Sequence, residues 1–237
     1  MRTDMRKPDE MRPVLIIPDY VIYPEGSVLI SMGNTKVICN VTIEEDVPKW
    51  MKVSQKVGGW VTGEYAMLPR STFTRTQRET LGLGGRTQEI ERLIGRSLRA
   101  SVNLEQLGSH TCIVDCDVLQ ADGGTRTAAI TGGYIALVLA LRKYIQLGKI
   151  SKDVFASPIA AVSVGVVKGV PILDLCYPED SNAEVDVNVV MNGKNEFIEV
   201  QGTAEAAAFP RSMLDDLLDL AQKGISELLS CQNNVLN

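Results

Sequence analysis

The sequence TCIVDCDVLQADGGTRTAAITGGYIALVLAL, residues 111–141, determines what lies in the interior of this protein. Its first part, Thr111–Gln120, is rich in apolar and β-branched residues and predicts a buried strand. Residues 121–126 form a tight loop that contains two glycines. Thr127–Leu147 predicts a helix that is apolar on nearly all sides as far as Leu141. Such a helix lies in the middle of a domain, so we expect the other elements to surround it.

Shorter runs on either side of this stretch predict the remaining elements. Residues 44–59 are polar and predict an irregular segment. Helices with one apolar stripe are expected at Thr87–Asn103 and Pro210–Gln232. Strands are expected at Val14–Pro18, Ser27–Ser31, Thr35–Ile43, Trp60–Met67, Ile159–Lys168, Pro171–Cys176, Val185–Val190 and Phe197–Gln201. Because strands and helices do not alternate regularly, the sequence predicts an α+β fold of mixed sheets with packed helices, in a single domain over residues 1–237.

The composition is that of an ordinary globular protein. Hydrophobic residues make up 45% of the chain and charged residues 22%, and the five scattered cysteines are expected to be reduced and buried. The only histidine, His110, has no partner at metal-ligand spacing, which argues against zinc. The N-terminal residues lack a signal-peptide pattern, and the apolar stretch 128–141 is too short to span a bilayer. We therefore expect a cytoplasmic protein that does not associate with membranes.

Charge is distributed unevenly along the chain, although the net charge is −5. Residues 70–99 hold seven arginines and three acidic residues, a balance of +4, whereas residues 174–205 hold eight acidic residues and one lysine, a balance of −7. Two interpretations are open. The segments form an uneven but ordinary surface, or they hold a polyanion on one side of a site and a metal ion on the other.

The sequence QADGGTRT, Gln120–Thr127, follows a predicted strand and begins a helix. The free N–H groups and the dipole at a helix N-terminus favour an anion, and the glycines permit a close approach. Thr125 adds a hydroxyl group and Arg126 a guanidinium that binds phosphate through two nitrogens. A plain strand-to-helix turn is the alternative. Because Gly84–Thr87 repeats the glycine, arginine and threonine at another helix start, the pattern favours a phosphate-type ligand.

Asp180 and Asp186 form a candidate metal site. Asp186 lies on the polar face of an alternating strand, and Asp180 lies in the loop just before it. Magnesium is commonly held by one or two carboxylates together with water and substrate phosphate oxygens. The alternative is that both carboxylates are merely solvated. Asp115 and Asp117 are a rival pair, but an apolar strand more often holds partnered structural aspartates.

A third candidate is the irregular loop at residues 68–86, which contains Arg70, Arg75 and Arg78 with Phe73 between them. Loop arginines can hold an RNA backbone and an aromatic ring can stack on a base. A solvated loop without a ligand is the alternative.

Eight stretches together resemble the ribonuclease PH family, bacterial phosphorolytic exoribonucleases that trim the 3′ ends of tRNA. They extend from near the N-terminus to the last predicted helix and therefore cover nearly the whole chain. The matching stretches are Tyr23–Ser27, Gly63–Arg70, Gly85–Ile90, Asp115–Gly132, Ala160–Gly165, Glu179–Ser181, Asp186–Met191 and Glu199–Glu205.

The resemblance implies a function and a role for each candidate residue. It implies phosphate-dependent 3′-to-5′ removal of terminal nucleotides, as nucleoside diphosphates, from tRNA precursors and other RNA 3′ ends. Inorganic phosphate is the co-substrate, Mg²⁺ the cofactor, and the assembly a homohexameric ring built as a trimer of dimers. The fold is related to the second domain of ribosomal protein S5. The implied phosphate-binding residues are Arg86, Gly124, Thr125 and Arg126; the metal ligands are Asp180 and Asp186; these two and Arg126 are catalytic; and Arg70, Arg75 and Arg78 bind RNA.

The sequence departs from the family pattern at three places, none of which carries an implied catalytic residue. Met5 stands where a glycine is expected. Lys56–Trp60 contains fewer glycines than the usual family sequence, and Thr80–Leu83 is more apolar than the usual polar stretch before the two glycines and the arginine. These departures concern the path of RNA and the subunit contacts. Two other functions remain open: a non-catalytic RNA-binding subunit of an exosome-like ring, and a hydrolytic two-metal nuclease. The first has no need of the arginines and aspartates, and the second needs a denser carboxylate cluster.

Overall fold

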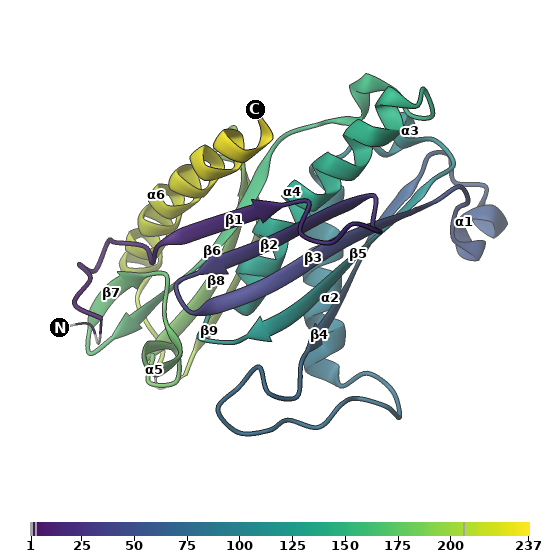
Figure 1. Cartoon of the computed structure of the whole chain (residues 1–237). Helices are drawn as coiled ribbons and strands as arrows, with labels where there is room; N and C mark the ends of the chain where they lie inside the picture. Colours follow the sequence, from purple (N-terminus) through teal and green to yellow (C-terminus); the bar gives the residue numbers. More distant parts are fainter. Residues whose placement is uncertain (1, 3, 206) are drawn as a thin grey trace.

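The computed structural model describes residues 2, 4–205 and 207–237. Two β-sheets lie on either side of one long helix, α4 (Thr125–Gln146), and a second long helix, α6 (Arg211–Leu236), covers the second sheet (Figure 1). The mixed arrangement confirms the predicted α+β class with mixed sheets and packed helices.

The first sheet has five strands in the order β1-β2-β3-β5-β4. Neighbouring strands are antiparallel except β4 and β5, which are parallel. A parallel pair requires a crossover connection, and α2 (Gly85–Arg99) lies in the segment that joins them. The strands are β1 Val14–Pro18, β2 Gly26–Met32, β3 Thr35–Glu44, β4 Trp60–Met67 and β5 Thr111–Gln120.

The second sheet has four antiparallel strands in the order β7-β6-β8-β9. Val185, Val187 and Val189 are buried on one side of β8, while Asp186 lies on the other side. The predicted alternation of this strand is therefore confirmed, and Asp186 projects away from the core. The strands are β6 Ile159–Val167, β7 Val170–Leu173, β8 Val185–Asn192 and β9 Phe197–Ala204.

Short helices account for most differences from the prediction. Residues 44–59, predicted to be irregular, contain α1 (Lys49–Ser54), in which Met51 is buried as an anchor. The strand predicted at Pro171–Cys176 ends at Leu173. The segment holding Asp180, predicted as a loop, is the short helix α5 (Tyr177–Asp180). Pro178 lies in its first turn, a position that favours proline. The helix α3 (Leu104–Leu107) and the 3-10 helix Lys152–Val154 were not predicted either.

The helix α4 packs against β2 and β3 on one side and β6 on the other, as its apolar sequence predicted. Gly26 on β2 permits this close contact, since a Cβ atom there would lie 2.0 Å from the carbonyl oxygen of Ala136. By length and composition α4 resembles a membrane span, but 78% of its most apolar window is buried inside the protein. One hydrophobic cluster joins α4 to both sheets. That the chain forms a single domain stays a prediction, with which this shared core agrees.

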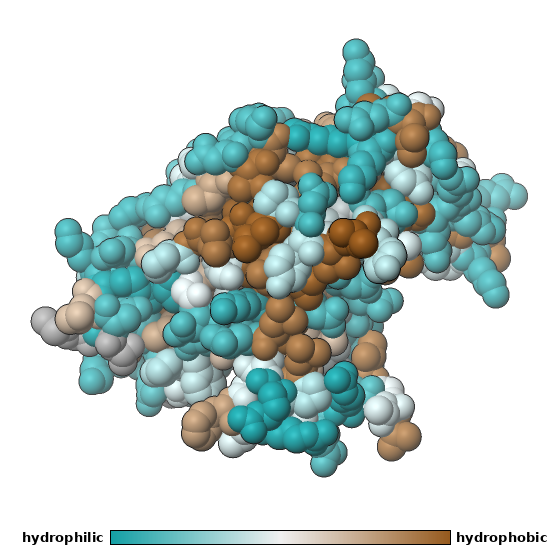
Figure 2. All heavy atoms as spheres, viewed as in Figure 1, coloured by the Kyte–Doolittle hydropathy of each residue, from teal (hydrophilic) through white to brown (hydrophobic). Residues whose placement is uncertain are grey.

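The face of the five-stranded sheet that α4 does not cover carries exposed apolar side chains. Figure 2 shows brown residues gathered over this face. Five exposed residues of β1 and of the segment between β1 and β2 form what we call the outer-sheet patch: Leu15, Ile17, Tyr20, Ile22 and Tyr23. Ile22 is 84% exposed and Tyr23 89% exposed, which is unusual for contiguous apolar residues and marks a contact surface.

Candidate active site

A cavity of about 580 Å³ lies where the end of β5, the beginning of α4, α5 and β8 meet. It brings together six residues predicted from the sequence: Arg86, Gly124, Thr125, Arg126, Asp180 and Asp186. Asn34, Tyr177 and Asn188 also line it, as do four residues of the loop after β4, namely Thr72, Phe73, Thr74 and Thr76. The two segments predicted to bind phosphate and the carboxylates of Asp180 and Asp186 therefore share one hollow, although the three segments are far apart in the sequence.

The loop between β5 and α4 shapes one wall of this cavity. Gly123 and Gly124 have φ angles of +76° and +64°, the left-handed region that favours glycine. A Cβ atom on Gly123 would lie 2.4 Å from the carbonyl oxygen of Leu175, so this position also needs glycine for space. The first backbone hydrogen bond of α4 runs from Ala128 to Gly124. Within the described part of the chain, no backbone acceptor pairs with the N–H groups of Thr125 and Arg126, which leaves them available to an anion.

Tyr65 on β4 holds the side chain of Thr125. The two hydroxyl oxygens lie 2.8 Å apart. Burial raises the pKa of Tyr65, although the hydrogen bond with Thr125 and the charges of Arg86 and Arg126 oppose this effect. The phenol therefore stays neutral and can donate to Thr125. Nothing in the local sequence indicates this contact, because the partners are 60 residues apart.

Tyr65→Phe is expected to weaken phosphate binding about fivefold, because one neutral hydrogen bond contributes about 1 kcal/mol. Phenylalanine keeps the ring in the core, so the free energy of unfolding should change by no more than about 1 kcal/mol. The KM for phosphate and the melting temperature measure the two effects. Tyr134→Phe is the control, since Tyr134 is a buried tyrosine of α4 outside the cavity. An unchanged KM in Tyr65→Phe contradicts the assignment.

The two glycine–arginine–threonine helix starts differ in the structure. At the start of α2 the carboxylate of Glu79 accepts hydrogen bonds from the N–H of Gly84 (3.1 Å) and the hydroxyl of Thr87 (3.0 Å). A protein carboxylate thus already occupies the anion position there. Among the described residues no acidic side chain caps α4 in this way. Of these two helix starts, α4 is therefore the one that offers its N-terminus to a phosphate, while Arg86 contributes its exposed side chain to the cavity.

Arg126 connects the beginning of α4 to the carboxylates. Its guanidinium lies 3.7 Å from the carboxylate of Glu89 on α2. Its positive charge also lowers the pKa of both Asp180 and Asp186, against the larger effect of burial. Arg126, Asp180 and Asp186 also line the same cavity, so all three can face one bound group.

Asp180 and Asp186 approach the cavity from α5 and β8. Burial, followed by the neighbouring charge of Asp180, raises the pKa of Asp186 to about 6. Burial also raises the pKa of Asp180, although Arg86 and Arg126 lower it. Asn188, two residues along β8, donates from Nδ2 to Oδ2 of Asp186 at 3.3 Å. The two negative charges of Asp180 and Asp186 repel each other, and a cation bound between them would reduce this repulsion.

The rival aspartates do not belong to this site. Asp115 and Asp117 lie half-buried on the outer side of β5 and do not line the cavity. Among the described residues, neither carboxylate has a side-chain hydrogen bond or ion pair in the structure, so the prediction that they are partnered is wrong. Burial raises the pKa of both, and Glu64 on β4 adds to the effect at Asp115.

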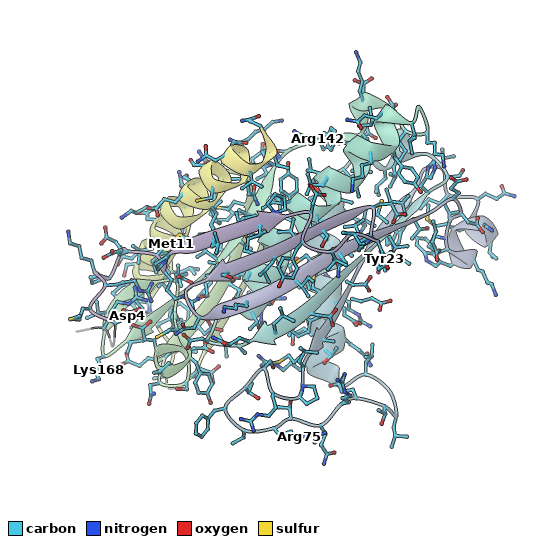
Figure 3. The ribbon with its side chains drawn as sticks, in the orientation of Figure 1. Asp4, Met11, Tyr23, Arg75, Arg142 and Lys168 are labelled. Carbon is cyan, nitrogen blue, oxygen red and sulfur yellow. The ribbon has the colours of Figure 1, made fainter. Side chains whose placement is uncertain are left out.

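The three arginines predicted to bind RNA lie outside the cavity wall. Arg70, Arg75 and Arg78 are exposed, on the loop that extends from the end of β4 below the body of the protein. Figure 3 labels Arg75 on this loop, away from the sheets. The same loop sends Thr72, Phe73 and Thr74 to the cavity, so the three arginines share a loop with residues that line it.

The donor set fits magnesium better than a metal bound only by protein. The described residues contain no group of three or more histidine, cysteine or acidic side chains that could hold a metal ion. Two carboxylates, Asp180 and Asp186, lie beside a cavity with anion-binding groups. Mg²⁺ keeps several waters and is typically bound by one or two carboxylates together with substrate phosphates. The pair thus suits Mg²⁺ that shares its coordination with a bound phosphate.

Comparison with known proteins places the chain among 3′ exoribonucleases. Residues 10–143 match the 3′ exoribonuclease family, domain 1, and residues 157–224 match domain 2 of that family. A protein named ribonuclease PH from Crocosphaera subtropica is 53% identical over 100% of this chain and 98% of its own length. Another protein of that name, from Bacillus cereus, is 55% identical over 100% of this chain and 97% of its own.

Similarity to a solved structure extends to the fold. The Archaeoglobus fulgidus exosome with RNA bound to the active site contains a chain that superposes with a TM-score of 0.79 at 21% identity. The match covers 97% of this chain and 91% of that chain. At this identity the likeness concerns the fold, which is the fold that the sequence resemblance implied.

Proposed function

The chain belongs to the 3′ exoribonuclease family whose members include ribonuclease PH, and on that premise we propose that it is a phosphorolytic nucleotidyltransferase acting on tRNA precursors and other RNA 3′ ends. It uses inorganic phosphate to remove terminal nucleotides in the 3′-to-5′ direction as nucleoside diphosphates. The observation that carries this proposal is the convergence of Arg126, Thr125 and the N-terminus of α4 with two carboxylates in one cavity.

The phosphate co-substrate fits the part of the cavity formed by α4. The N–H groups of Thr125 and Arg126, the Thr125 hydroxyl and the Arg126 guanidinium can donate to one phosphate, and Arg86 lines the same cavity. Bringing phosphate next to the RNA backbone places two anions side by side. The two arginines and the helix N-terminus lower the free energy of that arrangement.

The reaction transfers the terminal nucleotide to phosphate. An oxygen of phosphate attacks the phosphorus that links the last nucleotide to the one before it, and the bond from that phosphorus to the 3′ oxygen breaks. The departing 3′ oxygen takes a proton, which leaves RNA one nucleotide shorter and a nucleoside diphosphate. Arg126 donates to the oxygens on which negative charge accumulates.

Asp180 and Asp186 would hold Mg²⁺, which neutralises charge on the phosphate oxygens. Asn188 keeps the Asp186 carboxylate in place by its hydrogen bond. Asp180 and Asp186 need the charged form for this role, and the repulsion between them supports binding of a cation.

Arg70, Arg75 and Arg78 would hold the RNA backbone at the entrance of the cavity. A variant with all three changed to alanine is expected to bind single-stranded RNA more weakly and with less dependence on salt. Each phosphate contact adds about 0.7 to the slope of log affinity against log salt, so the slope should fall by about 2. Fluorescence anisotropy at several salt concentrations measures it. Arg211→Ala, an exposed arginine of α6, is the control, and an unchanged slope in the triple variant contradicts the assignment.

A homohexameric ring in the cytoplasm completes the proposal. The outer-sheet patch gives this chain an apolar surface that a second copy would cover. Sedimentation equilibrium of the 25.8 kDa chain tests for six copies. A monomer under assay conditions contradicts the ring.

A non-catalytic ring subunit and a hydrolytic nuclease are less well supported. A subunit that only binds RNA has no requirement for two phosphate arginines and two aspartates, yet all four line one cavity. A hydrolase that uses two metal ions needs a denser carboxylate cluster, and the part of the chain that the structure describes has no group of three or more histidine, cysteine or acidic side chains that could hold a metal ion.

The direct test is the product formed from a tRNA with a 3′ extension, in Mg²⁺, with and without inorganic phosphate. Nucleoside diphosphates that appear only with phosphate are the expected result. Nucleoside monophosphates formed without phosphate would show a hydrolase. Bound RNA without any product would show a non-catalytic subunit.

A further inference from the structure

A cluster of buried charges lies behind the cavity, between the N-terminal segment and the chain that leads into α5. It consists of Arg2, Arg6, Arg12, Asp174 and Glu179, which we call the arginine–carboxylate cluster. Asp174 and Glu179 belong to the acidic stretch noted in the sequence, but neither lines the cavity. The N-terminal segment and α5 lie at the same end of the molecule (Figure 1).

Arg12 contacts both Asp174 and the phosphate-binding loop. Its Nε and Nη2 lie 2.9 Å and 2.6 Å from the two carboxylate oxygens of Asp174, and its backbone N–H also donates to Asp174. The side chains of Arg12 and Asp174 are 4% and 1% exposed. The same guanidinium donates to the carbonyl oxygens of Asp122 and Gly123. The Arg12 guanidinium thus links the buried carboxylate of Asp174 to the peptide groups between Asp122 and Gly124.

These contacts determine how the loop is oriented. In a trans peptide the C=O and the N–H point in opposite directions. With the carbonyl groups of Asp122 and Gly123 directed at Arg12, the N–H groups of Gly123 and Gly124 point away from it. Thr35 supports the same orientation, since its Oγ1 donates to the Gly123 carbonyl at 2.6 Å. Arg12 and Thr35 therefore fix the peptides from which α4 begins.

Arg2 performs a similar task for α5. Its Nε and Nη2 each lie 2.8 Å from an oxygen of Glu179, and both side chains are 5% exposed. Glu179 also accepts from the N–H of Cys176 at the start of α5. Further bonds from Arg2 reach the carbonyl oxygens of Leu173 and Asp174. Because Asp180 is the next residue of α5, this ion pair fixes the backbone from which the Asp180 carboxylate projects.

Stability alone does not account for this arrangement. Charges buried away from water lose hydration, and apolar side chains of similar volume in the same place often give equal or greater stability. Arg12 and Asp174 do more than pair with each other, since their contacts join the phosphate-binding loop to the chain entering α5. An apolar pair could fill the space but could not hold the carbonyl groups.

We propose that Arg12 and Asp174 are positioning residues, which set the phosphate-binding loop relative to Asp180. Arg2 and Glu179 secure the α5 side of the same arrangement. This inference rests on the proposed phosphorolytic function, and it assigns no contact between the cluster and a substrate.

The decisive variant replaces the pair by apolar residues, Arg12→Met with Asp174→Leu. Its melting temperature should recover most of what the single change Arg12→Met loses, because Arg6, the other partner of Asp174, keeps its ion pairs with Asp4 and Glu179. Its KM for phosphate should remain about 10- to 100-fold raised, since a displacement of about 1 Å has effects of that size. Calorimetric phosphate binding without RNA should weaken by a similar factor. The matched control is Arg211→Met with Asp215→Leu, an exposed pair on α6 with a separation of 3.8 Å, which should change neither value.

A double variant with recovered stability and a phosphate KM within twofold of the original overturns the proposal and leaves the pair a structural role. If the double variant does not fold, Arg12→Lys takes its place. Lysine keeps a charge beside Asp174 but cannot reach both carbonyl groups, so phosphate binding should weaken at least about fivefold, and unchanged binding overturns the proposal. The product test on the unaltered protein distinguishes failure of the phosphorolytic function from failure of the positioning role. If the unaltered protein forms nucleoside diphosphates and the double variant binds phosphate normally, only the positioning role is rejected.

Discussion

Arg126→Ala is expected to lower the rate of phosphorolysis by roughly 10²–10³-fold, the effect of losing one donor that is already in place for the transition state. Arg126 lies on the first turn of α4 and influences both carboxylates of the cavity. The loss should be in kcat and in the KM for phosphate, because the guanidinium contacts phosphate before and during the transfer. Initial rates over a range of phosphate concentrations measure both constants.

The matched control is Arg92→Ala. Arg92 is an exposed arginine on α2 that does not line the cavity, and its removal changes the net charge by the same amount. The control should alter the rate by less than about twofold. A loss smaller than about threefold in Arg126→Ala is incompatible with the assigned role.

Asp186→Asn is expected to reduce the rate roughly 10³-fold and to remove most of its dependence on Mg²⁺, because Asp186 is one of the two carboxylates proposed to hold the metal ion. Asparagine has the same shape, so the hydrogen bond from Asn188 and the β8 alternation persist. Rates measured across a Mg²⁺ titration test this expectation. Asp117→Asn, on β5 outside the cavity, is the control. Full activity at ordinary Mg²⁺ in Asp186→Asn contradicts the metal site.

The raised pKa of Asp186 predicts how activity depends on pH, and it also predicts how Asp186→Asn changes the melting temperature. A pKa raised to about 6 means that the carboxylate form needed for Mg²⁺ is lost as the pH falls below 6. Activity at limiting Mg²⁺ should therefore decline about tenfold per pH unit below that value. Above pH 6 the charged, buried carboxylate destabilises the fold, so without Mg²⁺ the Asp186→Asn protein should melt at a higher temperature at pH 7.5 than the original. A lower melting temperature would indicate misfolding instead.

Local sequence patterns predicted the long elements well. The strands Val14–Pro18, Trp60–Met67 and Thr111–Gln120 have the predicted bounds, because alternation or a continuous apolar run encodes burial directly. The helix α5 was missed, since four residues are too few for a helical period and Pro178 suggests a loop. The helix α1 was missed for a similar reason, as only Met51 is buried in it.

The candidate site was predictable where its residues lie next to one another in the chain. Gly124, Thr125 and Arg126 form a recognisable strand-to-helix sequence, and all line the cavity. The contacts of Tyr65 with Thr125 and of Arg12 with Asp174 could not be predicted. They join residues 60 and 162 positions apart, and no local period reports on them. The role of Glu79 at the second helix start was hidden because it lies five residues before Gly84, outside the usual capping position.

The burial of α4 has a consequence for the thermodynamics of the two substrates. α4 is buried between two sheets and presents its first amides from a regular, packed helix, so phosphate binding orders little additional backbone. The loop proposed to hold RNA is different, because no backbone–backbone hydrogen bond described in the structure joins residues 72–83 to a residue beyond 68–86. On this proposal, RNA binding immobilises a loop that few backbone hydrogen bonds restrain, at an entropic cost of about 1–2 kcal/mol for each backbone residue that becomes fixed. Sequence changes in this loop will consequently alter RNA affinity mainly through entropy, whereas changes near the start of α4 will act through enthalpy.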